Sequence, residues 1–241
     1  MARSKRDIRE EEIEAAAYRL LEERGFAGTG MQAIAQAAHA SNETLYRWYG
    51  DKTGLYRALI TRNARLIVEQ IARARAEGHR GLAALERAGP VLLGAILSDR
   101  AIALNRAAAA DRTGQLGPVL AEAGRSAVLP LLIEIVAEAL AAGHLGTRLA
   151  PRMRGRLPLG DADPGDAAGD LAGDLAGDEA GGPAGDDAIA TELTELWLAL
   201  LIGDLQIRCV TGQITPPDPA QIALRSARAV DRLLRFYPPE G

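Results

Sequence analysis

Four side chains with different hydrogen-bonding groups lie within six residues of this 241-residue chain: Asn42, Glu43, Tyr46 and Arg47. On a helix, residues four apart share a face, so the carboxamide, carboxylate, phenol and guanidinium would point the same way. Such a set suits the edges of nucleobases and the oxygens of phosphates. Glu43 leaves two interpretations open, because its carboxylate could accept from a cytosine amino group or could simply face solvent.

A short helix and a turn are expected immediately before this polar face. The residues Met31, Ile34, Ala35 and Ala38 recur at helical spacing, which predicts one apolar stripe. Thr29 stands just before the stripe, where a hydroxyl can cap free backbone amides. His39 and the alanine after it are then expected to form the turn.

The polar face belongs to a second predicted helix that begins after Ser41, a residue type favoured at the N-cap. Ala40 and Leu45 stand at the two positions of a hydrophobic staple, and Leu45 and Tyr49 are expected to face the core. A third helix is expected to open at Asp51. Two short helices joined by a tight turn indicate a helix-turn-helix, which places its second helix in the major groove of DNA.

On these residues, positions 8–60 resemble the DNA-binding domain of the tetracycline-repressor (TetR) family. The matching positions, without a gap, are Gly25, Phe26, Thr29, Ile34, Ala35, Ala38, Ser41, Thr44, Leu45, Tyr46, Tyr49, Lys52 and Leu55. The resemblance implies a bacterial dimeric transcription factor, most often a repressor, whose helical C-terminal domain binds a small ligand that releases DNA. Together, the resemblance and the polar face predict which residues contact DNA. They are Thr29, Gln32, Ser41, Asn42, Glu43, Thr44, Tyr46, Arg47, Trp48 and Lys52.

Two positions in the turn depart from the family pattern. The chain has His39 where the family usually has glycine, and Ala40 where it usually has valine. The turn position tends to need a positive φ, which glycine adopts freely and histidine seldom does. The sequence therefore predicts some strain at His39.

An all-α fold is expected, because no stretch alternates between apolar and polar residues as a strand does. Residues 1–50 are expected to form a three-helix helix-turn-helix domain. Residues 51–241 are expected to form a helical bundle for ligand binding and dimerisation, with about nine helices in the whole chain. The later helices are expected at about 52–77, 82–97, 100–111, 116–142, 187–211 and 219–237, with Leu55, Leu59, Leu66 and Ile71 on the buried side of the first of these.

An acidic stretch interrupts this bundle. Residues 152–186 include near-tetrapeptide repeats of the type Leu-Ala-Gly-Asp, and we expect a disordered insertion there, because stacked aspartates and frequent glycines oppose a helix. Residues 161–187 hold nine of the 32 acidic residues and no basic one. The 28 basic residues elsewhere outnumber the remaining acids by five, so the overall net charge of −4 says little about the field near the polar face.

A homodimer is expected to form through the last two predicted helices, and the family resemblance also implies a dimer. Their expected interface residues are Leu193, Leu196, Leu200, Ile207, Val230, Leu233 and Leu234, with ordinary intramolecular core as the alternative. A dimer would present two reading helices to successive major-groove faces, which predicts a palindromic DNA operator.

The ligand site is expected inside the C-terminal bundle, and its ligand is not identified by the sequence. Trp197 offers a large apolar face with one donor, and Arg106, Asp204 and Arg208 are charges within apolar stretches. The alternative is that the tryptophan belongs to the core or the dimer contact, and that the charges are exposed or paired. Scarce aromatic residues, 4% of the chain, argue against a stacked multi-ring ligand.

Enzymatic chemistry has little support in the sequence. The three histidines, His39, His79 and His144, lack metal-ligand spacing, and we expect no enzyme activity, no cofactor and no metal site. Without an apolar leader or a bilayer-length apolar run, a cytoplasmic protein with no membrane partner is expected. A protein-interaction adaptor that has lost DNA binding, and less so a helical-bundle enzyme, remain the alternatives to a regulator.

Overall fold

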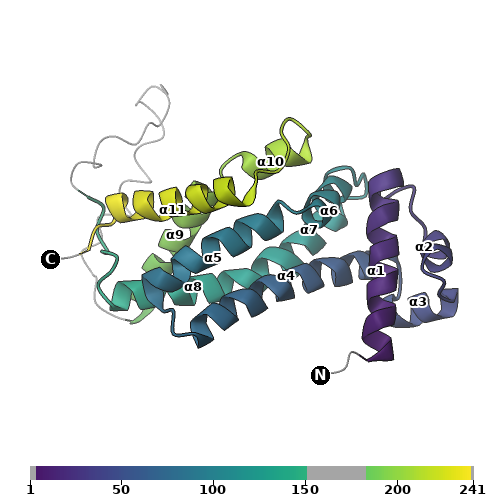
Figure 1. Cartoon of the computed structure of the whole chain (residues 1–241), viewed down its shortest axis with the longest axis horizontal. Helices are drawn as coiled ribbons and strands as arrows, with labels where there is room; N and C mark the ends of the chain where they lie inside the picture. The colour runs from purple at the N-terminus through teal and green to yellow at the C-terminus, as the bar shows by residue number, and fades with distance from the viewer. Residues whose placement is uncertain (1–3, 151–182, 240–241) are drawn as a thin grey trace.

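The computed structural model describes residues 4–150 and 183–239, which form helices and contain no strand (Figure 1). The expected all-α fold is confirmed for this part of the chain. The helices are α1 (Lys5–Arg24), α2 (Met31–Ala37), α3 (Asn42–Tyr49), α4 (Lys52–Ala76), α5 (Gly81–Ile96), α6 (Asp99–Ala109), α7 (Leu116–Leu120), the π-helical turn η1 (Ala121–Arg125), α8 (Ser126–Ala141), α9 (Pro183–Ile202), α10 (Leu205–Val210) and α11 (Pro219–Phe236).

Helices α1, α2 and α3 lie at one end of an elongated molecule, with α1 crossing the start of α4 (Figure 1). Their apolar stripes meet in one core that also includes the beginning of α4 and residues of α6 and α7. Its central members include Ile13, Ile34, Leu45, Leu55 and Leu104. The helix-turn-helix is therefore packed directly onto the body of the protein.

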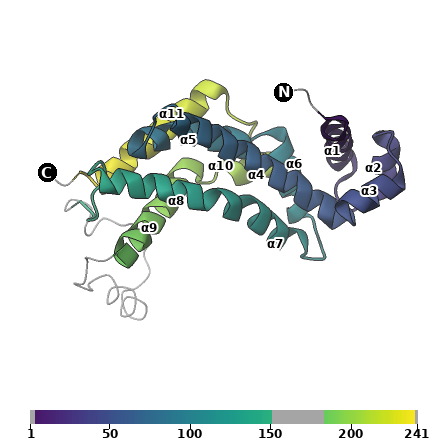
Figure 2. The same cartoon turned by 90° about the horizontal axis from the view of Figure 1, so that it is seen from below.

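The rest of the body is a bundle of α4, α5, α8, α9 and α11 around a second core. Figure 2 shows α7 and α8 running on in nearly one line beside α4, with α9 crossing near α8. Leu55, Leu59 and Ile71 of α4 are buried as expected, but Leu66 is 40% exposed and that expectation is wrong. The buried residues Leu59, Ile67 and Ile71 of α4 are spaced by multiples of four positions, so Ile67 occupies the buried place that was expected for Leu66.

Two of the expected long helices are interrupted. The helix expected over 116–142 contains the π-helical turn η1, and the helix expected over 187–211 breaks where Gly203 adopts a φ of +52°. Pro90 and Pro130 lie inside α5 and α8 without ending them. The expected acidic insertion falls mostly on 152–182, outside the described residues, but α9 begins at Pro183 and so corrects its expected end at residue 186.

The described helices differ in their length and apolar character from a single membrane span. None is by itself long and apolar enough to cross a bilayer, whereas α5 and α6, bent by 59° at their junction, meet the length and composition test as a pair.

The turn before α3 has the strain that the sequence predicts. His39 has a φ of +51°, and it is the only described residue other than glycine with a positive φ. The guanidinium of Arg9 lies 3.3 Å from the carbonyl oxygen of Ala38 and 3.4 Å from that of His39, so α1 holds the turn from outside. The left-handed conformation of a non-glycine residue costs about 1–2 kcal/mol, which the surrounding contacts must offset.

We expect His39→Gly to raise the free energy of unfolding by about 0.5–1 kcal/mol. Glycine relieves the left-handed strain, and its greater freedom in the unfolded chain cancels part of this gain. Chemical denaturation of the two proteins measures the difference. The control is Ala38→Gly, at a φ of −92°, which should be destabilising. Equal loss of stability in both variants would contradict the strain at position 39.

Candidate nucleic-acid interface and ligand cavity

Helix α3 is fixed at its start by a side-chain cap and along its inner side by a buried leucine. The Ser41 Oγ accepts a hydrogen bond from the Thr44 backbone N–H at 3.1 Å and lies 2.9 Å from the Thr44 hydroxyl, which confirms the expected N-cap. Leu45 is 0% exposed in the core of the N-terminal helices. At the other end, the Asp51 carboxylate caps α4 by accepting from the Gly54 N–H at 2.7 Å.

The opposite side of α3 is open and polar. Asn42, Glu43 and Arg47 are exposed, and Tyr46 is 53% exposed although it is a large aromatic residue. Gln32 of α2 is also exposed. Asn42, Glu43, Tyr46 and Arg47 therefore share one accessible side of α3. Helix α3 lies at the end of the molecule (Figure 1).

Trp48 extends this surface toward α1. It is half-buried, and the Arg6 guanidinium lies 5.3 Å from the centroid of its ring. Arg6 also pairs with Glu10 at 2.8 Å in an exposed bridge. Arg9 was not in the expected DNA-contacting set, because only the packing of α1 against the turn reveals its position.

Two expected DNA-contacting residues have partners inside the protein. Thr29 is 2% exposed, and its hydroxyl donates to the carbonyl oxygens of Leu20 at 3.0 Å and Gly25 at 2.8 Å. The N-cap of α2 is Gly30, without a side-chain bond, so the capping role expected for Thr29 is wrong and its buried side chain is not a DNA contact.

Lys52 is half-buried rather than free on the surface. Its Nζ donates to the Phe26 carbonyl oxygen at 2.8 Å and lies 4.0 Å from the centroid of the Phe26 ring. Desolvation lowers the pKa of this ammonium, while the charge of Asp111 acts in the opposite direction. Lys52 thus ties α4 to the loop after α1, and only its remaining donors are available to a phosphate.

A cavity of about 550 Å³ lies in the body of the protein, between α4, α5, α6, α8 and the α9–α10 segment, with α7 and η1 along one side. Its walls are mainly aliphatic, from residues such as Ile60, Ile67, Leu92, Leu132 and Ile202. This volume falls in the range of pockets that hold drug-sized ligands.

None of the four expected ligand-binding residues lines this cavity. Trp197 is fully buried in the second core, and its indole N–H has no hydrogen-bond partner among the described residues. Arg106 donates to the carbonyl oxygens of Val210 at 2.8 Å and Cys209 at 3.0 Å, which holds α6 to α10. Asp204 and Arg208 approach each other at 3.7 Å at the surface. The cavity is instead lined by three carboxamides, Asn63, Asn105 and Gln206, which the sequence analysis missed.

The residues expected at a dimer interface divide into two groups. Leu193, Val230 and Leu233 are buried inside the single chain, so for them the alternative of intramolecular core is correct. Leu196, Leu200 and Leu234 are half-buried, and Ile207 is exposed. Leu224 of α11, outside the expected set, is 52% exposed.

Polar contacts join α1 to the helices that wall the cavity. Arg62 of α4 pairs with Glu11 at 3.0 Å and with Glu14 at 3.2 Å. Burial raises the pKa of the Glu14 carboxyl, and the charge of Arg62 opposes this shift.

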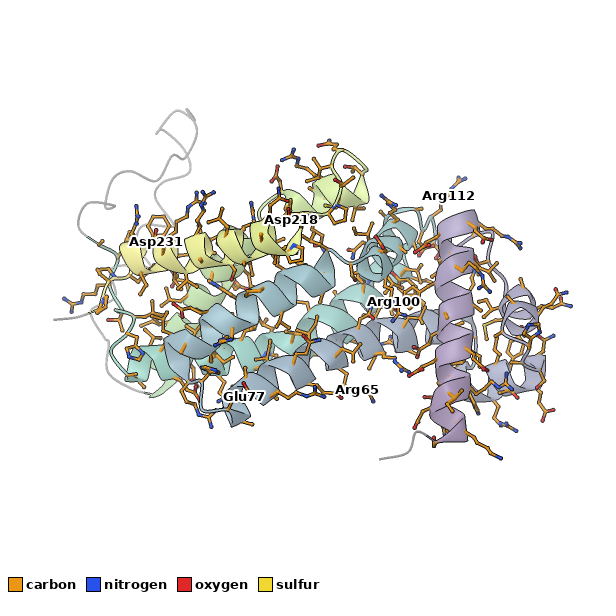
Figure 3. The ribbon with its side chains drawn as sticks, in the orientation of Figure 1. Arg65, Glu77, Arg100, Arg112, Asp218 and Asp231 are labelled. Carbon is orange, nitrogen blue, oxygen red and sulfur yellow. The ribbon has the colours of Figure 1, made fainter. Side chains whose placement is uncertain are left out.

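Tyr18 of α1 is the buried centre of the same junction. Its hydroxyl donates to the Leu59 carbonyl oxygen at 3.5 Å. Desolvation raises the pKa of this phenol to about 12, and the neighbouring Asn63 carboxamide acts in the opposite direction. The guanidinium of Arg100 lies 5.2 Å from the centroid of its ring, and Figure 3 shows Arg100 where α6 approaches α1. Asn63 therefore contacts both the cavity and the N-terminal domain.

The described residues contain no group of three or more histidine, cysteine, aspartate or glutamate side chains placed to hold a metal ion.

Comparison with known proteins gives a family match for the N-terminal helices. Residues 13–59 match the model of the family described as bacterial regulatory proteins, tetR family. This range contains most of α1, all of α2 and α3, and the start of α4. No curated protein sequence matches the chain.

Solved structures resemble the chain over nearly its whole length. A protein assigned to the TetR family of transcriptional regulators from Mesorhizobium loti is 18% identical, with a TM-score of 0.66 and coverage of 98% of this chain and 99% of that one. A TetR transcriptional regulator from Agrobacterium tumefaciens is 23% identical, with a TM-score of 0.60 and coverage of 96% and 95%. The fatty acid degradation regulator FadR from Bacillus halodurans is 13% identical, with a TM-score of 0.62 and coverage of 93% and 97%. At these identities, the likeness establishes a shared fold.

Proposed function

We propose that this chain, whose residues 13–59 match the TetR-family model and whose fold resembles that of solved TetR-family regulators, is a ligand-responsive transcriptional repressor. In this proposal it binds a palindromic operator as a homodimer, and a small molecule in the cavity releases it. The observation that carries the DNA-binding part is the exposed polar face of α3, held outward by the Ser41 cap and the buried Leu45.

The residues that we propose to contact DNA are those expected from the sequence, without the buried Thr29. Asn42, Glu43, Tyr46 and Arg47 are placed to approach base edges, and Gln32, Ser41, Thr44, Trp48 and Lys52 lie on or beside the same surface to contact phosphates. Arg6, stacked on Trp48, adds positive charge at its edge. Phosphate contacts would set the register of the helix, and the base-edge contacts would supply the sequence preference.

Dimerisation is proposed through α9 and α11. These helices pack on each other, and α11 exposes apolar surface where Leu224 stands among Ala220, Ala223 and Ala227. One reading helix makes few base contacts, whereas two of them about 34–36 Å apart would contact successive major-groove faces. A dimer would therefore cover the apolar surface of α11 and would explain why the operator is palindromic.

Ligand release is proposed as a shift between two populations of the dimer. Ile60, Asn63 and Ile67 of α4 line the cavity, and only two residues separate the end of α3 from the start of α4. A ligand that binds one position of α4 better than another would change the separation of the two α3 helices and so the share of DNA-competent dimers. Asn63 is the most direct connection, because its carboxamide also neighbours the Tyr18 phenol of α1.

The experiment that tests DNA recognition is a gel-shift with DNA from upstream of the chain's own gene. We expect Arg47→Ala to weaken binding by about 5- to 150-fold, because a bidentate arginine contact to a base is worth about 1–3 kcal/mol. Wild-type binding is expected to weaken steeply with salt, because each phosphate contact releases counterions.

The matched control is Arg65→Ala. Arg65 is an exposed arginine of α4 that pairs with Glu69 at 3.3 Å, away from the polar face of α3 (Figure 3). Its substitution should leave affinity unchanged. Equal losses in the two variants would show that arginine charge in general, and not the face of α3, supports binding. Absence of any DNA binding would favour the adaptor alternative.

A further inference from the structure

The walls of the cavity have a chemical character that limits what can occupy it. Apart from a few polar positions, the lining is made of aliphatic side chains and glycine, and no aromatic residue is among the lining residues. Gly117 of α7 leaves room, because a Cβ added there would have no heavy atom within 4 Å. Recognition by ring stacking is therefore unavailable, and an occupant would be held by apolar contact with aliphatic walls.

Charge is confined to one place in the lining. Arg125 of η1 and Glu195 of α9 are its only ionisable residues, and they pair with each other at 3.0 Å while remaining largely exposed. An ionised ligand would have to lose hydration against aliphatic walls without a free counter-charge, or else displace one partner of this pair. Both routes cost free energy, so the cavity disfavours carboxylates and ammonium groups.

Two carboxamides in the lining retain hydrogen-bonding capacity. Asn105 of α6 donates from Nδ2 to the Ala101 carbonyl oxygen at 2.8 Å, which leaves its Oδ1 as an acceptor without a partner among the described residues. The side chain of Gln206, on α10, has no hydrogen-bond partner within the described part of the chain. The two helices are held together by Arg106, so both carboxamides belong to one end of the site.

We propose that the cavity takes an uncharged, mainly aliphatic ligand that carries a hydroxyl group. The hydroxyl donates to the Asn105 Oδ1 and accepts from the Gln206 Nε2, because it offers both functions in one atom. This inference rests on the proposed function, in which the cavity is the effector site, and it names the chemical class of that effector. Asn63 is not assigned to the ligand, because its carboxamide also neighbours the buried Tyr18 of α1.

The test uses three probes of equal chain length, 1-octanol, octanoate and octylammonium, with the full chain at pH 7 and calorimetry as the readout. Octanol is expected to bind about tenfold more tightly than either ion, because only the ions lose charge hydration in the cavity. Gln206→Leu is expected to weaken octanol binding by about fivefold, the value of one hydrogen bond. Gln213→Leu, at an exposed position beyond α10, should change nothing.

Gly117→Leu provides a second check, because it fills the cavity without removing a polar group. It should abolish octanol binding while the melting temperature stays near that of the wild type. Tighter binding of either ion, no binding of octanol, or unchanged octanol binding in the Gly117 or Gln206 variant would overturn the proposal.

Operator binding measured on the same samples separates the proposed ligand class from the proposed regulator function. Octanol that binds as expected without releasing DNA would contradict the proposed release, and absence of operator binding without any probe would contradict the proposed regulator.

Discussion

Leu45→Ala is expected to lower the free energy of unfolding of the N-terminal helices by about 2–5 kcal/mol and to abolish operator binding at moderate temperature. The leucine is 0% exposed and packs in the core with residues such as Ile13, Ile34 and Leu55. Its truncation loses apolar burial and leaves a cavity, and both terms destabilise the domain. Denaturant titration followed by circular dichroism measures the stability, and a gel-shift measures the binding.

The control for this prediction lies on the opposite face of the same helix. Arg47→Ala should change stability by less than about 0.5 kcal/mol, because the side chain is exposed, yet it should weaken DNA binding. Octanol binding by the Leu45 variant, if the body remains folded, should persist. A Leu45 variant as stable as the wild type would mean that α3 is not anchored by its inner side.

Leu224→Asp is expected to convert the proposed dimer to a monomer and to weaken operator binding by about 100-fold or more. A charge placed at the centre of an apolar contact must be buried without a partner, and central interface residues are worth about 2 kcal/mol or more. Leu224 is 52% exposed in the single chain and lies on α11 near alanines that are also exposed. Sedimentation velocity reports the oligomeric state, and fluorescence anisotropy with labelled operator reports the affinity.

Leu66→Asp is the matched control for this substitution. It makes the same chemical change at another exposed leucine, 40% accessible and on α4 instead of α11. Asp231, which lies along the outer side of α11 in Figure 3 and pairs with Arg235 at 2.9 Å, shows that this helix already carries charge toward its end. The Leu66 variant should remain dimeric. A wild-type chain that is monomeric at micromolar concentration would refute the proposed interface.

The helix-turn-helix could be predicted from sequence because its determinants are local. The Ser41 cap and the positive φ at His39 depend on residues within one or two helical turns. The burial of Leu45 follows its place in a local apolar pattern, although its core partners include Ile13 of α1. Lys52 and Thr29 were harder to place, since their partners Phe26, Leu20 and Gly25 are set by how the end of α1 folds back. Position in the family pattern did not distinguish a DNA contact from an internal bond.

The cavity could not be predicted, because its lining comes from helices that are distant in sequence. Trp197 looked suited to a ligand by its chemistry, but its place on α9 directs it into the core. Asn105 and Gln206 carry no local signal, and only the packing of α6 on α10 brings them to one site. The same reasoning applies to Leu193 and Leu233, whose apolar character fits a dimer contact and an internal core equally well.

We propose above all that the exposed face of α3 reads DNA sequence. Selection of bound fragments from a random-sequence DNA pool by the full chain, followed by sequencing, tests it most directly. We predict an enriched inverted repeat whose half-sites lie about one helical turn apart, or a multiple of it, with a base preference that changes in the Arg47→Ala variant. A pool without enrichment, or the same enriched sequence for wild type and variant, would contradict the claim.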